Sequence, residues 1–314
     1  MIPYQLYLHC GNETILKKCY PEMKRYIAYE IGRLKNGMSS NRFYGDWNSP
    51  AGACPPEGSA FNATCFVYRI VTLMAEISKT LKMNSDEKEY RAFAEQMRKD
   101  LNERFFDEQE MIYHTEIKAG FRQTPTVLPL AFGIAPEEKR LDIAKSLAEH
   151  IHRIDHDHLS TGCMGLKYLA PVLTKFGQAE TAYAIVNQTD FPGWGYWISC
   201  GATTCWEEWS TRTRSYNHFY FGTIDEWFYQ YLAGIQPLEA GYRSFQVSPY
   251  PCGSVEEVKA SVETVYGKIS VHWIIQGDKF HMEVSVPVNT TAKIIMPHGE
   301  CYFVGSGQHQ YLSE

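Results

Sequence analysis

The sequence predicts a mainly α-helical fold, an α/α toroid incomplete at its N-terminus, followed by a small antiparallel β-sandwich. Up to about residue 235, apolar segments alternate with amphipathic segments at helical spacing. From about residue 240 the hydrophobic period becomes two, as in strands with one buried face. An α-solenoid would give the same alternation with a repeated sequence, and we find no repeat, which favours a closed barrel.

The helical part contains two kinds of segment. Segments rich in apolar residues on every side are expected to be inner helices, and they occupy residues 62–81 and 164–177. Amphipathic segments occupy residues 13–34, 86–106, 135–151 and 179–188, and residues 217–235 close the series. The segment 2–11 already has helical spacing and no cap, so we expect the chain to begin within a helix.

The strand part is clearest in residues 268–288. Ile269, Val271 and Trp273 alternate on one face of a first strand, and Phe280 begins a similar alternation in the next. Gly277 follows the first strand and predicts a hairpin turn. The linker GIQPLEAGY contains proline and glycine, so we place the domain boundary there, with a barrel at 1–237 and a β-sandwich at 238–314.

The bulk composition excludes some classes of function. The net charge of -6 and the lack of a basic run argue against a nucleic-acid partner. No apolar run approaches the ~20 residues that span a bilayer, so no membrane span is expected. The N-terminus does not have the pattern of a signal peptide. The compartment stays open: cytoplasmic, or periplasmic or secreted if the true N-terminus lies upstream.

Three loops combine acids, aromatic rings and a histidine. Asp46 and Trp47 lie in NRFYGDWNSP, Trp194 and Glu207 lie in TDFPGWGYWISCGATTCWEEW, and His218 lies in RSYNHFYFG. Each loop precedes an expected inner helix, so a toroid would bring all three to one mouth. Aromatic rings stack on the apolar faces of sugars, and carboxylates and imidazole transfer protons. The three loops together therefore indicate a carbohydrate-active site.

Each of these residues also has a purely structural explanation. Asp46 can cap its own turn, His218 can hydrogen-bond at a helix start, and the tryptophans can belong to the core. Of the adjacent acids Glu207 and Glu208, one is expected to be buried and the other solvated. The combination of the three clusters favours the functional interpretation.

These stretches resemble the later part of an α-L-rhamnosidase of glycoside hydrolase family 78. The resemblance runs nearly end to end and rests on FYGDW, TDFPGWGYWI, GATTCWEEW, YNHFYFGTIDEWFYQYLAGI, VYGKISVHWII and VPVNTTAKIIMP. It implies an (α/α)6 barrel followed by a β-sandwich. It also implies hydrolysis of terminal α-L-rhamnose from a glycoside or polysaccharide with inversion, without a catalytic metal or other cofactor.

The resemblance assigns roles residue by residue. The family's general base falls on Glu207. Glu208 stands where relatives often have arginine, so it is expected to be a solvated neighbour. Asp46 and Trp47 match the family's G-D-W loop, whose tryptophan lines the sugar pocket, and His218 matches a histidine that contacts the sugar. Asp46, Trp47, Trp194 and His218 are therefore expected to bind the substrate. The segment between the base and this histidine is shorter than in many relatives.

One family element has no counterpart in this sequence. Relatives carry an upstream D-C-P-x-R-E-x-x-G-W-x-G-D stretch that supplies the general acid, and we find nothing like it here. The family barrel has twelve helices, whereas this sequence accounts for about eight. We therefore expect a fragment that is weakly active or inactive alone, with its general acid upstream of Met1. Its open barrel edge would expose apolar helix flanks and favour self-association.

Two other classes of function stay open. The chain could be another (α/α)6 glycosidase, or a phosphorylase whose phosphate would need paired basic residues. Arg212 and Arg214 near Glu207 are the candidates for that pair, and we expect both to be loop charges. It could also be a catalytically incomplete remnant that retains only sugar binding. A comparison of turnover with and without phosphate distinguishes a glycosidase from a phosphorylase. Binding of the sugar without hydrolysis would identify the catalytically incomplete remnant.

Overall fold

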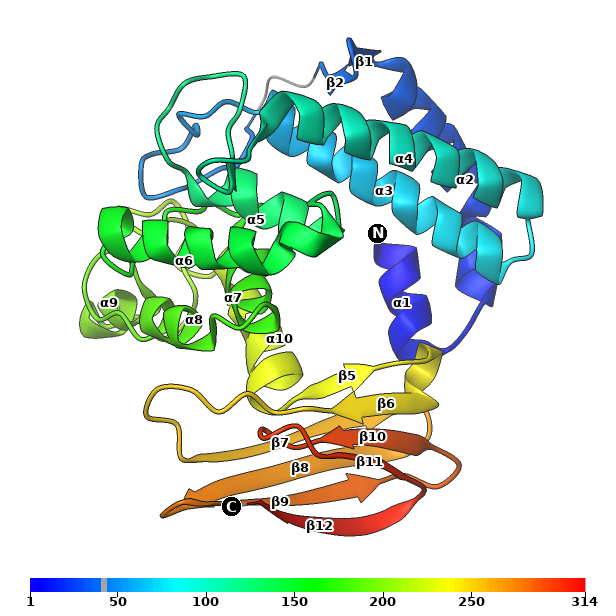
Figure 1. Ribbon diagram of the computed structural model, residues 1–314, viewed down its shortest axis with the longest axis vertical. Helices are drawn as coiled ribbons and strands as arrows, with labels where there is room; N and C mark the ends of the chain where they lie inside the picture. Colours follow the sequence, from blue (N-terminus) through cyan, green and yellow to red (C-terminus); the bar gives the residue numbers. More distant parts are fainter. Residues whose placement is uncertain (41–43, 314) are drawn as a thin grey trace. The chain divides into compact units, whose positions relative to one another are not determined.

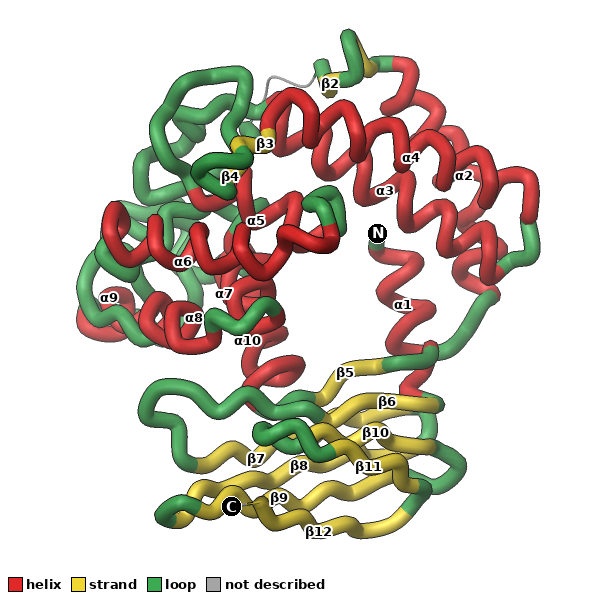
Figure 2. The backbone as a smooth tube through the Cα atoms, viewed as in Figure 1, coloured by secondary structure: helices red, strands yellow, loops and turns green. Residues whose placement is uncertain are grey.

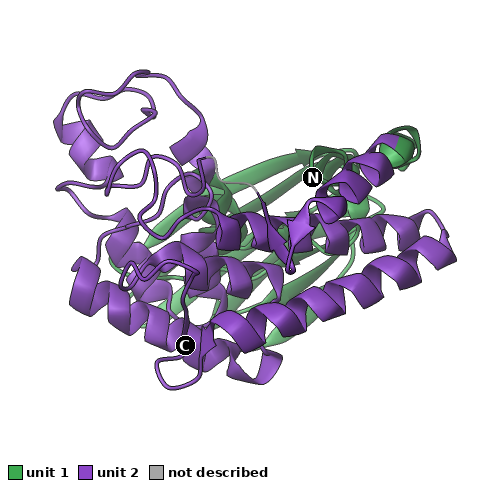
Figure 3. Ribbon diagram, turned by 90° about the horizontal axis from the view of Figure 1, so that it is seen from above, with its two compact units in different colours: residues 1–21, 225–314 green, residues 22–224 purple. Residues whose placement is uncertain are grey.

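The computed structural model describes residues 1–40 and 44–313, so the Asn41–Phe43 part of the first candidate loop lies outside the described residues. The chain forms two compact units (Figure 3). One comprises residues 22–224, and the other comprises residues 1–21 with residues 225–314. The expected combination of a helical barrel part and a β domain is confirmed, whereas the boundary near residue 237 stays a prediction.

The helical unit is built from antiparallel helix pairs (Figures 1 and 2). Its helices are α2 (Thr14–Gly32, which begins in the other unit), α3 (Ala60–Thr80), α4 (Asn84–Phe105), α5 (Gln123–Phe132), α6 (Arg140–Asp155, after the 3-10 turn Glu137–Lys139), α7 (Leu166–Lys175), α8 (Ala179–Val186), α9 (Trp194–Ser199) and the 3-10 turn Tyr220–Thr223. Short ribbons lie between them: β1 (Leu34–Lys35), β2 (Met38–Ser39), β3 (Phe106–Asp107) and β4 (Ile112–Tyr113).

The pairing explains the alternation of apolar and amphipathic segments. Helix α3 packs on α4, α5 on α6, and α7 on α8, while α3, α5 and α7 also contact one another in series. The inner helices are therefore covered by one another as well as by their partners. Helix α5 is buried along almost its whole length, whereas α4 buries one stripe that includes Tyr90, Met97 and Leu101.

Helix α3 corrects the statement that no apolar segment approaches the length of a membrane span. Among the described helices, it is the one that is long and apolar enough to cross a membrane by length and composition. Most of it is nevertheless buried inside the helical unit, including Phe61, Val71 and Met74. That burial is typical of the central helix of a folded domain.

The other unit contains two four-stranded sheets. Their orders are β11-β10-β6-β5 and β12-β9-β8-β7. The strands are β5 (Ile235–Pro237), β6 (Ser244–Val247), β7 (Glu257–Thr264), β8 (Gly267–Gln276), β9 (Lys279–Val286), β10 (Thr291–Ile295), β11 (Cys301–Val304) and β12 (Gly307–Ser313). All described pairs in these sheets are antiparallel except β6 with β10, which is parallel. The predicted sandwich is thus confirmed, with one parallel pair that was not expected.

The core of the sandwich contains the residues that the period of two predicts. Ile269, Val271 and Trp273 of β8 are buried together with Phe280 and the other alternate residues of β9. The two strands are joined at Gly277, whose φ of 62° suits the predicted tight turn. The hairpin prediction is therefore confirmed.

Helices at both ends of the chain complete this unit. Helix α1 (Ile2–Cys10) ends at Gly11 in the left-handed conformation and packs on the 3-10 turn Ala240–Tyr242. A Cβ on Gly11 would lie 3.3 Å from the Cα of Gly241, so the two backbones are in close contact. Helix α10 (Ile224–Trp227) continues into a π-helical turn, Phe228–Leu232, before β5.

Candidate functional site

Glu207 lies in the long loop that follows α9. Its neighbours Trp206 and Trp209 are 5% and 2% exposed, whereas the Glu207 side chain is 16% exposed. The Glu207 amide donates to the Ser215 carbonyl at 2.9 Å, which closes residues 207–215 into a loop. The carboxylate is therefore held beside buried indoles but keeps access to solvent.

Arg214 binds both adjacent acids of this loop. Its Nη2 lies 2.9 Å from Oε1 of Glu207, and its Nε lies 2.8 Å from Oε1 of Glu208. Glu208, expected to be a solvated neighbour, is 26% exposed and shares the guanidinium with Glu207. Arg214 contacts Oε1 of Glu207, and none of the described residues hydrogen-bonds to Oε2.

A second loop is tied to this one although it lies far away in the sequence. The Asn48 side-chain amide donates to the Glu207 carbonyl at 3.1 Å, and Nη2 of Arg214 donates to Oδ1 of Asn48 at 3.4 Å. The Arg214 guanidinium carbon lies 5.5 Å from the centre of the Trp47 ring, which is a cation–π distance. Tyr44 packs edge-on against the same ring at 4.9 Å. The predicted residues Trp47 and Glu207 are thus brought together through Arg214.

Asp46 is completely buried, and its carboxylate is used by the protein itself. Oδ2 accepts from the Thr124 hydroxyl at 2.5 Å and the Gly162 amide at 2.6 Å. Oδ1 accepts from the amides of Met164 and Gly165, both at 2.9 Å. Burial raises the pKa of Asp46, and these four donors oppose the rise. The sequence analysis expected a sugar contact at Asp46, whereas here it joins its loop to the start of α7.

The contact between these two loops is tight at Gly162. A Cβ at this position would lie 2.2 Å from the Asp46 carbonyl oxygen and 2.4 Å from that of Trp47. The Cys163 amide also donates to the Trp47 carbonyl at 2.9 Å. The backbone that carries Trp47 is therefore fixed from behind by residues 162–165.

The tryptophans form one aromatic cluster. The rings of Trp197, Trp209 and Phe221 stack with centroid separations of 4.5 Å. Trp194 meets Trp209 edge-on at 5.3 Å and donates its indole N–H to the Phe221 carbonyl at 3.1 Å. Trp194 is half-buried, so part of its ring remains accessible. The cluster forms a rigid support beneath the loop that carries Glu207.

His218 is joined to the same loop. Its amide donates to the Cys205 carbonyl at 2.8 Å, and its Nδ1 accepts from the Tyr220 amide at 3.3 Å. Nδ1 of a neutral imidazole in this position carries no proton, so Nε2–H is the donor. The ring stacks on Phe219 at 4.9 Å. His218 therefore presents one N–H group from a half-buried position.

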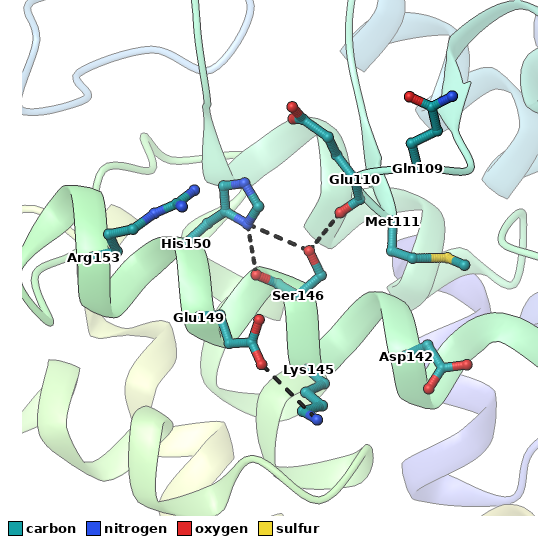
Figure 4. A pocket seen from close by; sticks show the side chains of 9 residues that line it. All are labelled: Gln109, Glu110, Met111, Asp142, Lys145, Ser146, Glu149, His150 and Arg153. Carbon is teal, nitrogen blue, oxygen red and sulfur yellow. Dashed lines mark hydrogen bonds and ion pairs between the residues drawn. The ribbon is translucent and has the colours of Figure 1, made fainter.

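A hollow elsewhere in the helical unit contains none of the predicted site residues. It measures 540 Å³ and is lined by residues of α6 and of the β3–β4 turn (Figure 4). Some of its polar groups are paired with one another: the Ser146 hydroxyl donates to the Glu110 carbonyl, and Nδ1 of His150 contacts the Ser146 carbonyl at 2.8 Å. Among residues 1–40 and 44–313, no group of three or more His, Cys, Asp or Glu side chains is arranged to hold a metal ion.

Two functional residues were not identified from the sequence. Arg214 was assigned to a loop charge, and Asn48 was not considered, although together they join the loops of Trp47 and Glu207. The available signal was charge balance, because two adjacent acids, Glu207 and Glu208, require a nearby cation if both are ionised.

Comparison with known proteins agrees with this architecture. A family model described as the bacterial alpha-L-rhamnosidase 6 hairpin glycosidase domain matches residues 1–232, and one described as the bacterial alpha-L-rhamnosidase C-terminal domain matches residues 234–310. An alpha-L-rhamnosidase of Alteromonas sp. (strain LOR) is 31% identical, with 95% of this chain and 34% of that protein aligned. One from Formosa agariphila is 30% identical, with 95% of this chain and 33% of that protein aligned.

Solved structures give the same result. The alpha-L-rhamnosidase of Dictyoglumus thermophilum superposes with a TM-score of 0.94 at 30% identity, over 99% of this chain and 38% of that one. The Streptomyces avermitilis enzyme, solved with L-rhamnose, gives 0.89 at 27% identity, over 100% of this chain and 32% of that one. The chain thus spans about a third of the length of these relatives. It belongs to the bacterial α-L-rhamnosidase family, with the six-hairpin glycosidase domain followed by the family's C-terminal domain.

Proposed function

We propose that this chain is part of a glycoside hydrolase that removes terminal α-L-rhamnose with inversion, and that Glu207 is the general base. The observation that carries the proposal is the setting of Glu207, a partly exposed carboxylate that is held by Arg214 and lies in the same loop as the buried Trp206 and Trp209. Relatives aligned over nearly the whole chain are named α-L-rhamnosidases, and one was solved with L-rhamnose.

The proposed reaction needs two carboxyl groups. In an inverting glycosidase they stand ~6.5–9.5 Å apart, which leaves room for a water beneath the anomeric carbon. Glu207 would accept a proton from that water as its oxygen bonds to the anomeric carbon. The bond to the leaving oxygen breaks at the same time, and a general acid protonates that oxygen. We propose that this acid lies outside the sequence of 314 residues.

The other site residues receive supporting roles in this proposal. Trp47 and Trp194 are half-buried rings that would pack on the apolar face of the sugar. His218 would donate from Nε2 to a sugar hydroxyl, because its Nδ1 is occupied. For Asp46 we propose a positioning role in place of sugar contact, because its oxygens already accept four hydrogen bonds.

The phosphorylase alternative loses support from the same contacts. Arg214 is committed to two carboxylates and to Asn48, so it is not available to hold a phosphate near Glu207. Repulsion by the two acids would also disfavour an anion there. We therefore prefer hydrolysis.

The test uses leaving groups that differ in their need for a proton. A dinitrophenolate or fluoride ion departs without protonation, so a site with a base and no acid should hydrolyse dinitrophenyl α-L-rhamnoside or α-L-rhamnosyl fluoride. Methyl α-L-rhamnoside should react slowly or not at all, since acid assistance contributes ~10²–10⁴-fold. Proton NMR of the first product should detect β-L-rhamnose.

Two variants of adjacent residues give the matched comparison. Glu207→Gln should abolish hydrolysis of the activated substrates, whereas Glu208→Gln should retain most of it. Equal activity of wild type and Glu207→Gln would refute the base assignment. Rapid hydrolysis of the methyl glycoside by the chain alone would refute the missing acid, and α-L-rhamnose as first product would refute inversion.

We also propose that the chain self-associates through the helical unit. Tyr26 and Tyr29 of α2 are 56% and 59% exposed, as large apolar side chains at an uncovered helix face would be. Sedimentation velocity over a wide concentration range should detect oligomers. A single monomeric species at all concentrations would contradict this proposal.

A further inference from the structure

Arg214 contacts four residues of the candidate site, whereas a solvated charge in a loop needs no such contacts. One guanidinium bonds to Glu207 at 2.9 Å, to Glu208 at 2.8 Å and to Asn48 at 3.4 Å, and lies over Trp47 at 5.5 Å. These partners belong to two loops that are about 160 residues apart in the sequence. Arg214 is therefore the point at which both loops meet.

The geometry divides the two oxygens of Glu207 between two tasks. Oε1 is held by Arg214, and among described residues Oε2 has no hydrogen-bond partner. A planar guanidinium that is bound to two carboxylates has little rotational freedom, so it fixes the direction of Oε2. It also compensates the second negative charge, which Glu208 places next to the first.

We propose that Arg214 is the positioning residue that aims the free oxygen of Glu207 at the attacking water and holds the Trp47 loop against it. The inference rests on the proposed function of Glu207 as a base. It assigns no direct substrate contact to Arg214.

If Arg214 served only to stabilise the fold, its ion pairs would be expected to be buried. The Arg214 side chain is 55% exposed, and exposed ion pairs contribute little to the stability of a fold. Misplacement of a reacting group by about 1 Å, in contrast, can cost ~10²-fold in rate. Loss of Arg214 should therefore act on catalysis much more than on folding.

Arg212 provides a matched control in the same loop. It carries the same charge two positions earlier, is exposed, and has no side-chain bond to any residue in the described part of the chain. With the activated rhamnoside as substrate, Arg214→Ala should lower kcat by ~10–100-fold with KM nearly unchanged. Arg212→Ala should leave both constants near wild type.

One further variant and a chemical rescue separate position from charge. Arg214→Lys should recover only part of kcat, because a single ammonium cannot bind both carboxylates and stack on Trp47. Millimolar guanidinium added to Arg214→Ala should restore part of kcat, and should not affect the wild type or Arg212→Ala. A change in KM alone, or no change in either constant, would overturn the proposal.

Hydrogen exchange supplies a readout that does not depend on turnover. The Glu207 amide bonds to Ser215, and the Asn48 amide bonds to Ala53 at 3.2 Å. In Arg214→Ala both amides should exchange faster, and in Arg212→Ala neither should. If the wild type does not hydrolyse the activated rhamnoside, the proposed function fails, and exchange alone decides whether Arg214 holds the loops. Unchanged exchange at both amides would overturn that role.

Discussion

Replacement of Asp46 by alanine tests how the loop that carries Trp47 is held. The change removes the acceptor of the buried amides of Gly162 and Gly165, of the partly buried amide of Met164 and of the Thr124 hydroxyl. The hydroxyl can rotate toward another acceptor, but the three amides cannot move without moving the backbone. Asparagine is not a neutral substitute for Asp46, because its side-chain NH2 group would replace one carboxylate oxygen and would face N–H or O–H donors without an acceptor.

The expected loss follows from those three amides. A buried donor left without a partner costs ~1–3 kcal/mol, so the Gly162 and Gly165 amides together cost ~2–6 kcal/mol, with a smaller cost at Met164, partly offset by removal of a buried charge. We expect a net loss of about 2 kcal/mol or more, from a total stability of ~5–15 kcal/mol. The Trp47 loop should lose its fixed position before the rest of the unit unfolds.

Urea denaturation followed by tryptophan fluorescence, with hydrogen exchange at residues 162–165, provides the assay. Asp107→Ala is the matched control, because its carboxylate accepts from the amides of Gln109 and Glu110 in a turn that water can reach. That variant should lose less than about 1 kcal/mol. The reasoning is refuted if Asp46→Ala unfolds within about 1 kcal/mol of wild type and the amides of residues 162–165 stay protected.

Three further predictions concern other parts of the chain. Trp209→Ala should destabilise the helical unit by ~3–5 kcal/mol, because it removes a buried ring from a stack; a loss below about 1 kcal/mol in urea denaturation would contradict this. Gly234→Ala should lower the melting temperature of the strand-containing unit, since its φ is 81° and a Cβ would lie 2.3 Å from the Ser248 carbonyl carbon; an unchanged melting temperature would be inconsistent with that clash. Burial alone would lower the pKa of His158. The bond of 2.8 Å to Asp190, together with the backbone carbonyls of Asp155 and His156, outweighs burial and raises the pKa of His158 above 6.5. The bond to His158 lowers the pKa of Asp190 below 3.8. The pair should therefore stabilise the fold between pH 3.8 and 6.5 and lose its effect as pH rises through the raised value. Asp190→Asn should lower the melting temperature near pH 5 and not near pH 9, and an equal effect at both would exclude this linkage.

Helices with sustained periodicity could be predicted from the sequence, and irregular ones could not. The apolar run predicted at 62–81 is α3 at Ala60–Thr80. Helix α5 was not predicted, because Pro125 and Pro129 interrupt its pattern. Pro125 lies in the first turn, where its missing N–H costs nothing, and Pro129 is tolerated within a fully buried helix. Burial by neighbouring helices, which decides the outcome, is not visible in a local pattern.

Strand pairing shows a similar division. The β8–β9 hairpin follows from local alternation and a glycine turn. The parallel pairing of β6 with β10, which sets Thr291 opposite Ser244, joins strands from distant parts of the sequence. Register between such strands depends on packing of the whole sandwich, so the local sequence does not determine it.

The sequence indicates candidate site residues, whose role stays a prediction, but it does not indicate the contacts between them. Glu207, Trp47 and His218 were identified from their loops. The bridge made by Arg214 depends on closure of residues 207–215 and on the arrival of Asn48 from a distant loop. The burial of Asp46 depends likewise on residues 162–165, which lie more than 100 positions further along the chain.

The most direct test of the central claim is a crystal structure of this chain with L-rhamnose. We predict that the sugar lies against Trp47, with Oε2 of Glu207 within hydrogen-bond distance of the anomeric hydroxyl or of a water beneath the anomeric carbon. L-Rhamnose bound away from Glu207, or a Glu207 carboxylate turned toward bulk solvent in the sugar complex, would contradict the account.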